Sequence, residues 1–368
     1  MSQSKGIRVF ILGAGCSAEC GYPPGTGFAT HLEDFVREIP NQCPTVKQSV
    51  TDTLNLLKEL PRMETLDQLA RHVDKKFRDW ESAQGIVIAD GKELSRRQAL
   101  TDKQIRDAKI ATSAMFLAKE PKARETGLPR YRQFITEVFG GPPCEIAVRE
   151  TDCHVLTFNY DRLFEIAFLE SFPDYDASRG FLYGKDALNS AFNPDFGCCS
   201  VVQPVPDRFC FLKLHGSAGW WAKRDNETGE RRCWPSGPLK ALSLVEIEKS
   251  IPKQRGVFGW EPLITFPHER QLSREFFKSN EKSIGYAWAP YTDAVWKHAA
   301  DVVANATEVK VVGYSFNPID SRYMVNELLN KTTCQKVVIQ NKDVETVRKN
   351  LASYTQLRGR LEFDPTPF

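Results

Sequence analysis

The sequence of 368 residues predicts an α/β fold in which a Rossmann-like parallel sheet carries flanking helices. Two observations support this prediction. Five short apolar runs of the kind that form buried strands are spread along the chain, and amphipathic helical patterns separate several of them. Each run also leads directly into a polar or glycine-containing string. Because ligands bind at the carboxyl edge of open parallel sheets, we expect these strings to gather at one site.

The predicted strands and helices follow in chain order. Residues 9–12 form the first strand and lead into Gly13-Ala14-Gly15-Cys16-Ser17, after which Thr26 is expected to cap a helix that contains Phe28 and Val36. Further strands are predicted at residues 153–158, 209–214, 309–312 and 336–339. An apolar stripe over 294–303 predicts a helix before the fourth strand, and a second stripe over 347–357 predicts one after the fifth.

Two stretches differ in character from this alternating pattern. Residues 41–150 are charged and helix-forming, and predict a mostly helical insertion. Residues 218–290 are rich in Trp, Gly and Pro, and predict a loop-rich second insertion. The Rossmann-like core is therefore expected to comprise residues 1–40, 151–217 and 291–368.

Composition excludes several classes of protein. The 49 Lys and Arg residues nearly balance the 47 Asp and Glu residues, so net charge gives no reason to expect nucleic acid or a membrane as the main partner. No apolar run approaches the roughly 20 residues needed to cross a bilayer, and the run at 9–12 is too short for a signal peptide. Ten cysteines without a C-x-x-C spacing indicate neither a metal site nor a redox motif. We expect a cytoplasmic protein without a bound metal.

The glycine-containing string after the first strand suits a phosphate group. Gly13 and Gly15 allow the backbone to turn tightly and to approach a diphosphate, and Ser17 can reach a phosphate or a ribose. A tight turn from strand to helix without any ligand explains the same glycines. Cys16 is expected to be a small packing residue.

The strings after the second and third strands carry the residues best suited to chemistry. Asn159 and Asp161 alternate along an extended segment, so both side chains can face the same cleft, although a turn that ends the strand explains them as well. His215 closes a strand before Gly216-Ser217 and can act as a base near neutral pH. Of the six histidines it is the best placed, with His268 as a second candidate.

The last two strings are less distinctive. Gly313-Tyr314-Ser315 is similar to the start of a serine-hydrolase elbow, but that motif needs glycine where this chain has Asn317, which argues against a hydrolase of that class. Asp320 is expected to cap a helix. Asn341 or Asp343 can hydrogen-bond a ribose, and a strand-end turn is the alternative.

In this order the strings resemble those of the sirtuin superfamily, and more closely its SIR2-like branch of bacterial NAD-consuming and phage-defence proteins. Gly13-Ala14-Gly15-Cys16-Ser17 is similar to the family's GAG-x-S loop, and Thr157-Phe158-Asn159-Tyr160-Asp161 to its T-Q-N-x-D string. Leu214-His215-Gly216 is similar to its catalytic-histidine string, and Gly313-Tyr314-Ser315 to its late G-x-S. Asn341 falls where the family has a ribose-binding asparagine. The resemblance covers roughly half of the chain.

The resemblance implies an NAD pocket with assigned roles. Asn159 would orient the ribose hydroxyls or an attacking water, His215 would be the general base, and Asp161 would hold the nicotinamide carboxamide. Gly13, Ala14, Gly15 and Ser17 would bind the diphosphate, and Gly313, Ser315 and Asn341 the adenosine side.

Three departures from the family pattern narrow the expected activity. The family's first loop continues through Pro-Asp-Phe-Arg, whereas residues 23–28 here lack the arginine. The zinc module of the deacylases has four cysteines, and only Cys233 is present in the corresponding region. The string at 257–261 is only loosely similar to the segment that holds acyl-lysine peptides.

We therefore expect an NAD glycohydrolase (NADase) that releases nicotinamide and ADP-ribose, acting as an NAD-depleting effector in antiviral (phage) defence. Two alternatives remain: an NAD-dependent protein deacylase or ADP-ribosyltransferase, and a non-catalytic module that senses NAD or ADP-ribose. NAD would be a substrate. Because uncontrolled depletion of NAD is toxic, we expect a homo-oligomer whose activity depends on assembly, with a separately encoded activator such as a ring ATPase or a nucleic-acid-guided protein.

Overall fold

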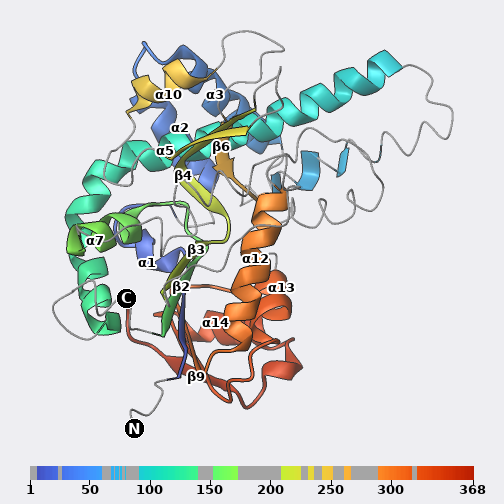
Figure 1. Cartoon of the computed structure of the whole chain (residues 1–368). Coiled ribbons are helices and arrows are strands. Elements are labelled where there is room, and N and C mark those ends of the chain that lie inside the picture. The colour runs from blue at the N-terminus through green and yellow to red at the C-terminus, as the bar shows by residue number, and fades with distance from the viewer. Residues whose placement is uncertain are drawn as a thin grey trace.

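The computed structural model has a six-stranded sheet at its centre, with helices on both faces (Figure 1). It describes residues 6–23, 27–59, 68–69, 71–73, 75–76, 79, 91–139, 152–172, 209–224, 231–235, 243–251, 261–266, 289–316 and 321–368. All neighbouring strands of the central sheet are parallel, and their order is β3-β2-β1-β7-β8-β9. The strands are β1 (Arg8–Leu12), β2 (Cys153–Thr157), β3 (Cys210–Lys213), β7 (Glu308–Val312), β8 (Val337–Gln340) and β9 (Leu361–Asp364).

This architecture confirms the predicted α/β class and all five predicted strands. The sixth strand, β9, was not predicted from the sequence. It lies at an edge of the sheet and is only partly buried, with Glu362 and Asp364 alternating with Leu361 and Phe363. Such a strand lacks the continuous apolar run that marks a fully buried parallel strand.

The two faces of the sheet are covered by different helices because side chains of a strand alternate between faces. In β1, Phe10 and Leu12 face one buried cluster and Val9 and Ile11 face the other. The first cluster includes the helices α2 (Phe28–Glu38), α3 (Pro44–Glu59), α5 (Gly91–Phe139) and α7 (Leu163–Ser171). The second includes α12 (Ala289–Ala304), α13 (Ser321–Tyr323) with its π-helical continuation Met324–Leu329, and α14 (Val344–Leu351).

The helix predictions agree with these elements in outline. The helix predicted over 294–303 is α12, and the one predicted from Phe28 is α2, which begins after Gly27. Thr26 and Asp320, the expected caps, lie outside the described residues. The helix predicted over 347–357 is shorter than expected, since α14 ends at Leu351 and a separate 3₁₀ turn follows at Thr355–Leu357.

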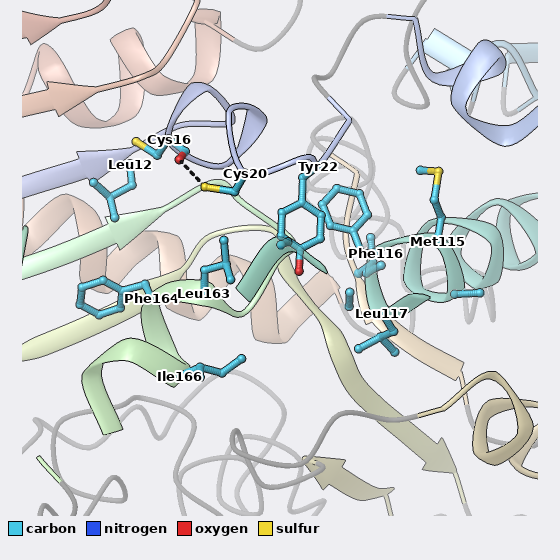
Figure 2. Close-up of a cluster of buried hydrophobic side chains, with 14 of the residues drawn as sticks. Leu12, Cys16, Cys20, Tyr22, Met115, Phe116, Leu117, Leu163, Phe164 and Ile166 are labelled. Atoms are coloured by element: carbon cyan, nitrogen blue, oxygen red, sulfur yellow. Dashed lines mark hydrogen bonds between the residues drawn. The ribbon is translucent and has the colours of Figure 1, made fainter. Parts of the chain in front are cut away.

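The long helix α5 packs directly on the sheet. Phe134 of α5 lies edge-on against Phe10 of β1, with ring centroids 5.3 Å apart. Figure 2 shows α5 residues such as Met115 and Phe116 in the same apolar region as Leu12 of β1 and Leu163 of α7. The helical segment predicted as an insertion thus supplies part of the layer that covers one face of the core. The division of the chain into core and insertions stays a prediction.

A second, smaller sheet lies in the region predicted to be rich in loops. Its strands β4 (Gly216–Arg224), β5 (Arg231–Pro235) and β6 (Glu261–Ile264) are antiparallel, in the order β5-β4-β6. The helix α10 (Leu244–Ser250) begins at a capping box formed by Ser243 and Glu246. The sequence did not predict this sheet, because Trp, Gly and Pro residues obscure a period of two.

No helix in the described part of the chain is both long enough and apolar enough to cross a membrane.

Candidate functional site

The five strings identified in the sequence follow five adjacent strands at their carboxyl ends. Residues 13–17 follow β1, residues 158–161 follow β2, and residues 214–217 follow β3. Residues 313–315 follow β7, and Asn341 follows β8. Because β3, β2, β1, β7 and β8 are neighbours in one parallel sheet, these segments share one edge.

The glycines of the first and fourth strings pack against one another. A Cβ on Gly13 would lie 2.5 Å from Cα of Tyr314, and a Cβ on Gly15 would lie 2.6 Å from the carbonyl oxygen of Gly313. The amide of Gly15 donates to that carbonyl at 2.7 Å. Gly313 itself has a φ of 64°, in the left-handed region that favours glycine. The close approach of the two loops therefore explains these glycines without a ligand.

The first loop continues into α1 (Gly15–Ala18), which is a single turn. Its amides are largely used inside the protein: Cys16 donates to the carbonyl of Gly13 at 3.0 Å and Ser17 to that of Ala14 at 3.1 Å. The thiol of Cys16 is buried and donates to the carbonyl of Val312 at 3.2 Å, and burial raises its pKa. Cys16 is thus the packing residue that the sequence predicted, while diphosphate binding by this loop stays a prediction.

The segment after β2 is held by hydrogen bonds on both sides. The amide of Phe158 donates to the carbonyl of Leu12 at 3.0 Å, and the amide of Asn159 donates to the Thr157 hydroxyl at 3.0 Å. The carbonyl of Tyr160 accepts the amide of Ala218 at 2.9 Å. Residues 158–161 are therefore fixed between the end of β1 and the start of β4.

Asn159 and Asp161 are buried beside Ser17. Nδ2 of Asn159 donates to Oγ of Ser17 at 3.2 Å, and Oδ1 of Asp161 accepts the amide of Leu163 at 3.0 Å. The second bond is the strand-end turn that was the alternative interpretation of Asp161. Within the described part of the chain, however, Oδ1 of Asn159 and Oδ2 of Asp161 have no partner in hydrogen-bonding geometry. Buried polar atoms are usually satisfied, so these two oxygens are candidates for ligand contacts.

The carboxyl of Asp161 lies in a region rich in buried charges. Burial raises its pKa, and the positive charge of Lys213 and the nearby Ser17 hydroxyl oppose that shift. Nζ of Lys213 donates to the main-chain carbonyl of Asp161 and to Oε1 of Glu165, the latter at 2.7 Å. Burial also raises the pKa of Glu165. Lys213 is the last residue of β3, two positions before His215, and it thus fixes the backbone of Asp161.

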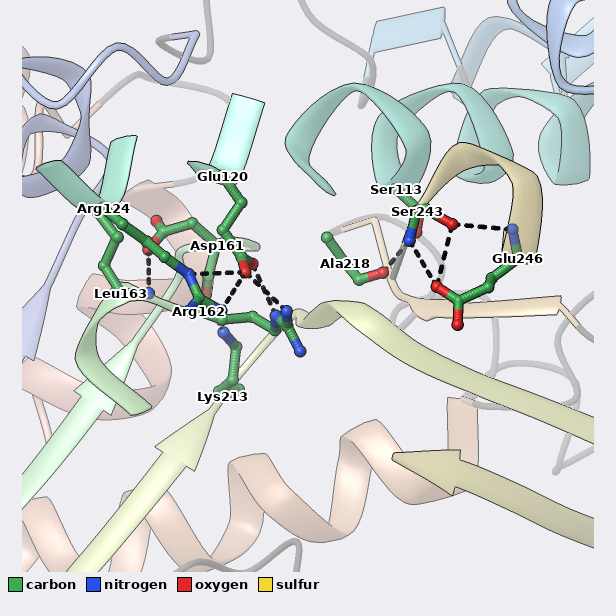
Figure 3. A network of polar contacts seen from close by, with 10 residues as sticks. All are labelled: Ser113, Glu120, Arg124, Asp161, Arg162, Leu163, Lys213, Ala218, Ser243 and Glu246. Carbon is green, nitrogen blue, oxygen red and sulfur yellow. Dashed lines mark hydrogen bonds and ion pairs between the residues drawn. The ribbon is translucent and has the colours of Figure 1, made fainter. Parts of the chain in front are cut away.

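Arg162 forms a second buried ion pair next to Asp161. Its Nε and Nη2 donate to the two carboxylate oxygens of Glu120 on α5, at 2.8 and 2.7 Å (Figure 3). Arg124 donates to the same carboxylate at 2.7 Å. This bidentate geometry ties the segment that carries Asp161 to α5.

His215 lies between β3 and β4 in an aromatic enclosure. Its ring packs edge-on against Phe158 with centroids 5.1 Å apart, and it is tilted against Tyr160 at 6.1 Å and Trp296 at 6.3 Å. One segment therefore presents Phe158 and Tyr160 to His215, and Asn159 and Asp161 to the Ser17 side. Side chains of residues 158–161 thus alternate between two sides, and the segment places the candidate base His215 close to the candidate amide Asn159.

The two candidates for the adenosine side differ in their surroundings. Ser315 is exposed, and its carbonyl accepts Nδ2 of Asn350 at 2.9 Å. Asn341 donates from Nδ2 to the carbonyl of Tyr314 at 3.0 Å and accepts the amide of Asp343 at 2.9 Å. Its side chain thus stabilises the loop after β7 and closes a turn at the end of β8, which agrees with the alternative of a strand-end turn. A contact of Asn341 with a ribose stays a prediction.

Sequence reasoning missed two contributors to this site. Lys213 is a lysine inside an otherwise apolar strand, which is a signal that could have identified it. Tyr131 of α5 gave no such signal: its hydroxyl lies 2.9 Å from Oγ of Ser17, and the two residues are 114 positions apart in the sequence.

Neither of two surface hollows in the described part of the chain coincides with this site. A hollow of about 240 Å³ lies beside α14 and β9, and one of about 210 Å³ lies between α3 and α5. Among the described residues no group of three or more His, Cys, Asp or Glu side chains is arranged to hold a metal ion. His268, the second candidate base, lies outside the described residues.

Comparison with known proteins finds matches among solved structures. No protein-family model matches the sequence, and no curated protein does. Among solved structures, a Sir2 homologue in complex with NAD is 12% identical with a TM-score of 0.40, over 99% of this chain and 85% of that one. Sir2Tm bound to a propionylated peptide is 11% identical with a TM-score of 0.35, over 98% and 88%. A mutant Sir2 homologue in complex with 2'-O-acetyl ADP-ribose is 13% identical with a TM-score of 0.38, over 95% and 93%.

Proposed function

We propose that this protein is an NAD glycohydrolase that cleaves NAD into nicotinamide and ADP-ribose. The observation that carries the proposal is the arrangement of residues 158–161. This segment carries two buried oxygens, on Asn159 and Asp161, that have no hydrogen-bond partner among the described residues, while its aromatic side chains enclose His215. An amide, a carboxyl and an imidazole are thus held at the carboxyl edge of a parallel sheet, where such folds bind nucleotides.

These groups suit the bond that would be broken. Nicotinamide leaves the cationic pyridinium of NAD as a neutral molecule, so cleavage needs no general acid. The enzyme must instead stabilise an oxocarbenium-like ribose and admit a nucleophile. In the proposal, Oδ1 of Asn159 orients the ribose hydroxyls or the attacking water, and His215 accepts the proton that this water loses. Oδ2 of Asp161 binds the carboxamide of nicotinamide.

The remaining candidates would bind the other parts of the substrate. Gly13, Ala14, Gly15 and Ser17 would contact the diphosphate from the loop after β1. The loop after β7, with Gly313 and the exposed Ser315, would lie along the adenosine side together with Asn341. Support for this placement comes from the order of the strands, because β1 separates the catalytic loops after β2 and β3 from the loops after β7 and β8.

The first experiment measures products directly. Purified protein is incubated with NAD, and nicotinamide and ADP-ribose are followed by chromatography, with and without an acetylated peptide. We expect release of nicotinamide without peptide, abolished in Asn159→Ala and His215→Ala. His298→Ala in α12 and Asn330→Ala after the π-helical segment are matched controls outside the site, and should keep wild-type activity.

Other results would change the assignment. Cleavage that requires the acetylated peptide would favour a deacylase, and tight NAD binding without turnover would favour a sensor. Cleavage that persists in both Asn159→Ala and His215→Ala would contradict the proposed site.

We further propose, from the sequence resemblance, that the enzyme is an NAD-depleting effector of antiviral defence that is regulated by assembly into a homo-oligomer. The turnover rate per subunit should then rise with protein concentration, in step with an increase in mass measured by size-exclusion chromatography with light scattering. A separately encoded activator, such as a ring ATPase or a nucleic-acid-guided protein, would produce the same rise at low concentration. A monomer with equal specific activity at every concentration, alone or with its partner, would contradict this proposal.

A further inference from the structure

A short chain of hydrogen bonds connects α5 to the candidate catalytic asparagine. The hydroxyl of Tyr131 lies 2.9 Å from Oγ of Ser17, and Oγ of Ser17 accepts Nδ2 of Asn159 at 3.2 Å. All three side chains are buried. A helix from the segment 41–150 therefore reaches the site through two bonds.

The position of Tyr131 is fixed by its neighbours. Its ring packs edge-on against Phe164 of α7 and against Phe368, with centroids 6.3 and 5.0 Å apart. The preceding residue, Arg130, pairs with Glu19 at the end of α1. Two successive residues of α5 thus hold the C-terminal half of α1, Tyr131 through Ser17 and Arg130 through Glu19.

Tyr131 keeps its proton in this buried position. Complete burial and the nearby carboxyl of Asp161 raise the pKa of Tyr131 well above its usual value of 10.0, so the phenol keeps its proton. The phenol and the Ser17 hydroxyl share one hydrogen bond of 2.9 Å, in which either oxygen can be the donor. In either case Oγ of Ser17 is held between Tyr131 and Asn159, since it also accepts Nδ2 of Asn159 at 3.2 Å.

The consequence concerns the orientation of the Asn159 amide. Because Nδ2 is committed to Ser17, Oδ1 must point to the opposite side, where it has no partner among the described residues. Without the phenol, the serine hydroxyl can rotate and the amide can turn over, which would exchange an acceptor for a donor at the ribose.

We propose that Tyr131 is a positioning residue, which acts through Ser17 to keep the acceptor oxygen of Asn159 directed at the substrate. This inference rests on the proposed NAD cleavage at the same site. It assigns α5 a part in turnover, although no residue of α5 was predicted to belong to the site.

The test compares two tyrosines that each share a hydrogen bond with a serine. Tyr131→Phe removes the hydroxyl next to Ser17, and Tyr354→Phe removes one that lies 3.1 Å from Oγ of Ser321, outside the candidate site. We expect Tyr131→Phe to lower kcat for NAD about tenfold or more, because misplacement of a reacting group by about 1 Å can cost a hundredfold. KM should change less than kcat. Tyr354→Phe should retain wild-type kcat.

A second comparison isolates the route through the serine. In a Ser17→Ala background, Tyr131→Phe should have no further effect on kcat, because the intermediate hydroxyl is already absent. If Tyr131→Phe lowers kcat in the Ser17→Ala background as much as it does in the wild type, the proposal is overturned. Equal kcat values for Tyr131→Phe and Tyr354→Phe would overturn it as well.

Crystal structures of the wild type and Tyr131→Phe separate this inference from the proposed function. If wild-type protein does not cleave NAD, the proposed function fails, and the orientation of the Asn159 amide still decides the structural claim. A rotated amide in Tyr131→Phe supports the positioning role. An unchanged hydrogen bond from Nδ2 to Ser17 overturns it.

Discussion

The buried ion pair between Glu120 and Arg162 allows a quantitative test of how α5 is joined to the site. The two side chains are 1% and 2% exposed and form two hydrogen bonds. Glu120→Met removes the carboxylate and both hydrogen bonds that it accepts from the buried Arg162 guanidinium. Loss of one partner from a buried pair costs about 3–5 kcal/mol, so we expect a decrease of that size in the free energy of unfolding.

The opposite substitution leaves Glu120 with a second cation. In Arg162→Met the carboxylate keeps its bond from Arg124, whose side chain is 24% exposed. We expect a loss of about 1–3 kcal/mol, typical of a charged group with reduced hydrogen bonding. The double variant should cost less than the sum of the two single variants, since each single variant leaves a charge that the other one removes.

Urea unfolding followed by circular dichroism measures these differences. The matched control joins the same two helices: Arg132 of α5 pairs with Glu170 of α7, but these side chains are 51% and 32% exposed. Arg132→Met should cost less than about 1 kcal/mol because solvent screens the pair. Equal losses for Glu120→Met and Arg132→Met, or strict additivity in the double variant, would refute the reasoning from burial.

Three further predictions concern the loops, pH and the substrate. Gly13→Ala places a Cβ 2.5 Å from Cα of Tyr314 and must separate the loops after β1 and β7. Urea unfolding should therefore show a decrease of about 1–3 kcal/mol in the free energy of unfolding. Unchanged stability would contradict the close packing. Burial lowers the pKa of His154 from 6.5 to about 4, with a smaller effect of His298, so the stability that the neutral ring contributes is complete above pH 6.5 and is lost as pH falls toward 4. His154→Leu should remove up to about 3 kcal/mol of this pH dependence, measured as the difference in unfolding free energy between pH 7 and pH 4.5. Asp161→Asn should raise KM for NAD about tenfold, because it weakens a charge-assisted hydrogen bond to the carboxamide; an unchanged KM in the cleavage assay would exclude that contact.

The sequence was sufficient to predict the parts of the fold that are buried on both sides. Strands β1, β2, β3, β7 and β8 read as apolar runs because helices cover both faces of the sheet. The edge strand β9 exposes Glu362 and Asp364 in alternation, and the second sheet contains Trp, Gly and Pro residues that resemble loops, so neither was recognised. The same physical rule, that carboxyl ends of parallel strands share an edge, brought Ser17, Asn159, Asp161 and His215 into the candidate site.

The contacts of α5 could not be predicted in the same way. The helix carries no motif, and its links to the site join residues far apart in sequence, as Tyr131 with Ser17 and Glu120 with Arg162 do. Local patterns contain no information about such pairs. What the sequence does contain is Pro121 and Pro129 within the helix, and proline bends a helix by removing a backbone hydrogen bond.

These prolines explain how one helix can hold both sides of the candidate site. Glu120 and Tyr131 are eleven residues apart, about 16 Å along a straight helix, and a proline lies next to Glu120 and another two residues before Tyr131. Figure 1 shows α5 curving around one side of the molecule past α7. With this curvature, Glu120 reaches Arg162 beside Asp161 while Tyr131 reaches Ser17 beside Asn159. A shift of α5 would therefore move both the Asp161 carboxyl and the Asn159 amide, which makes α5 the element that couples the two sides of the candidate site.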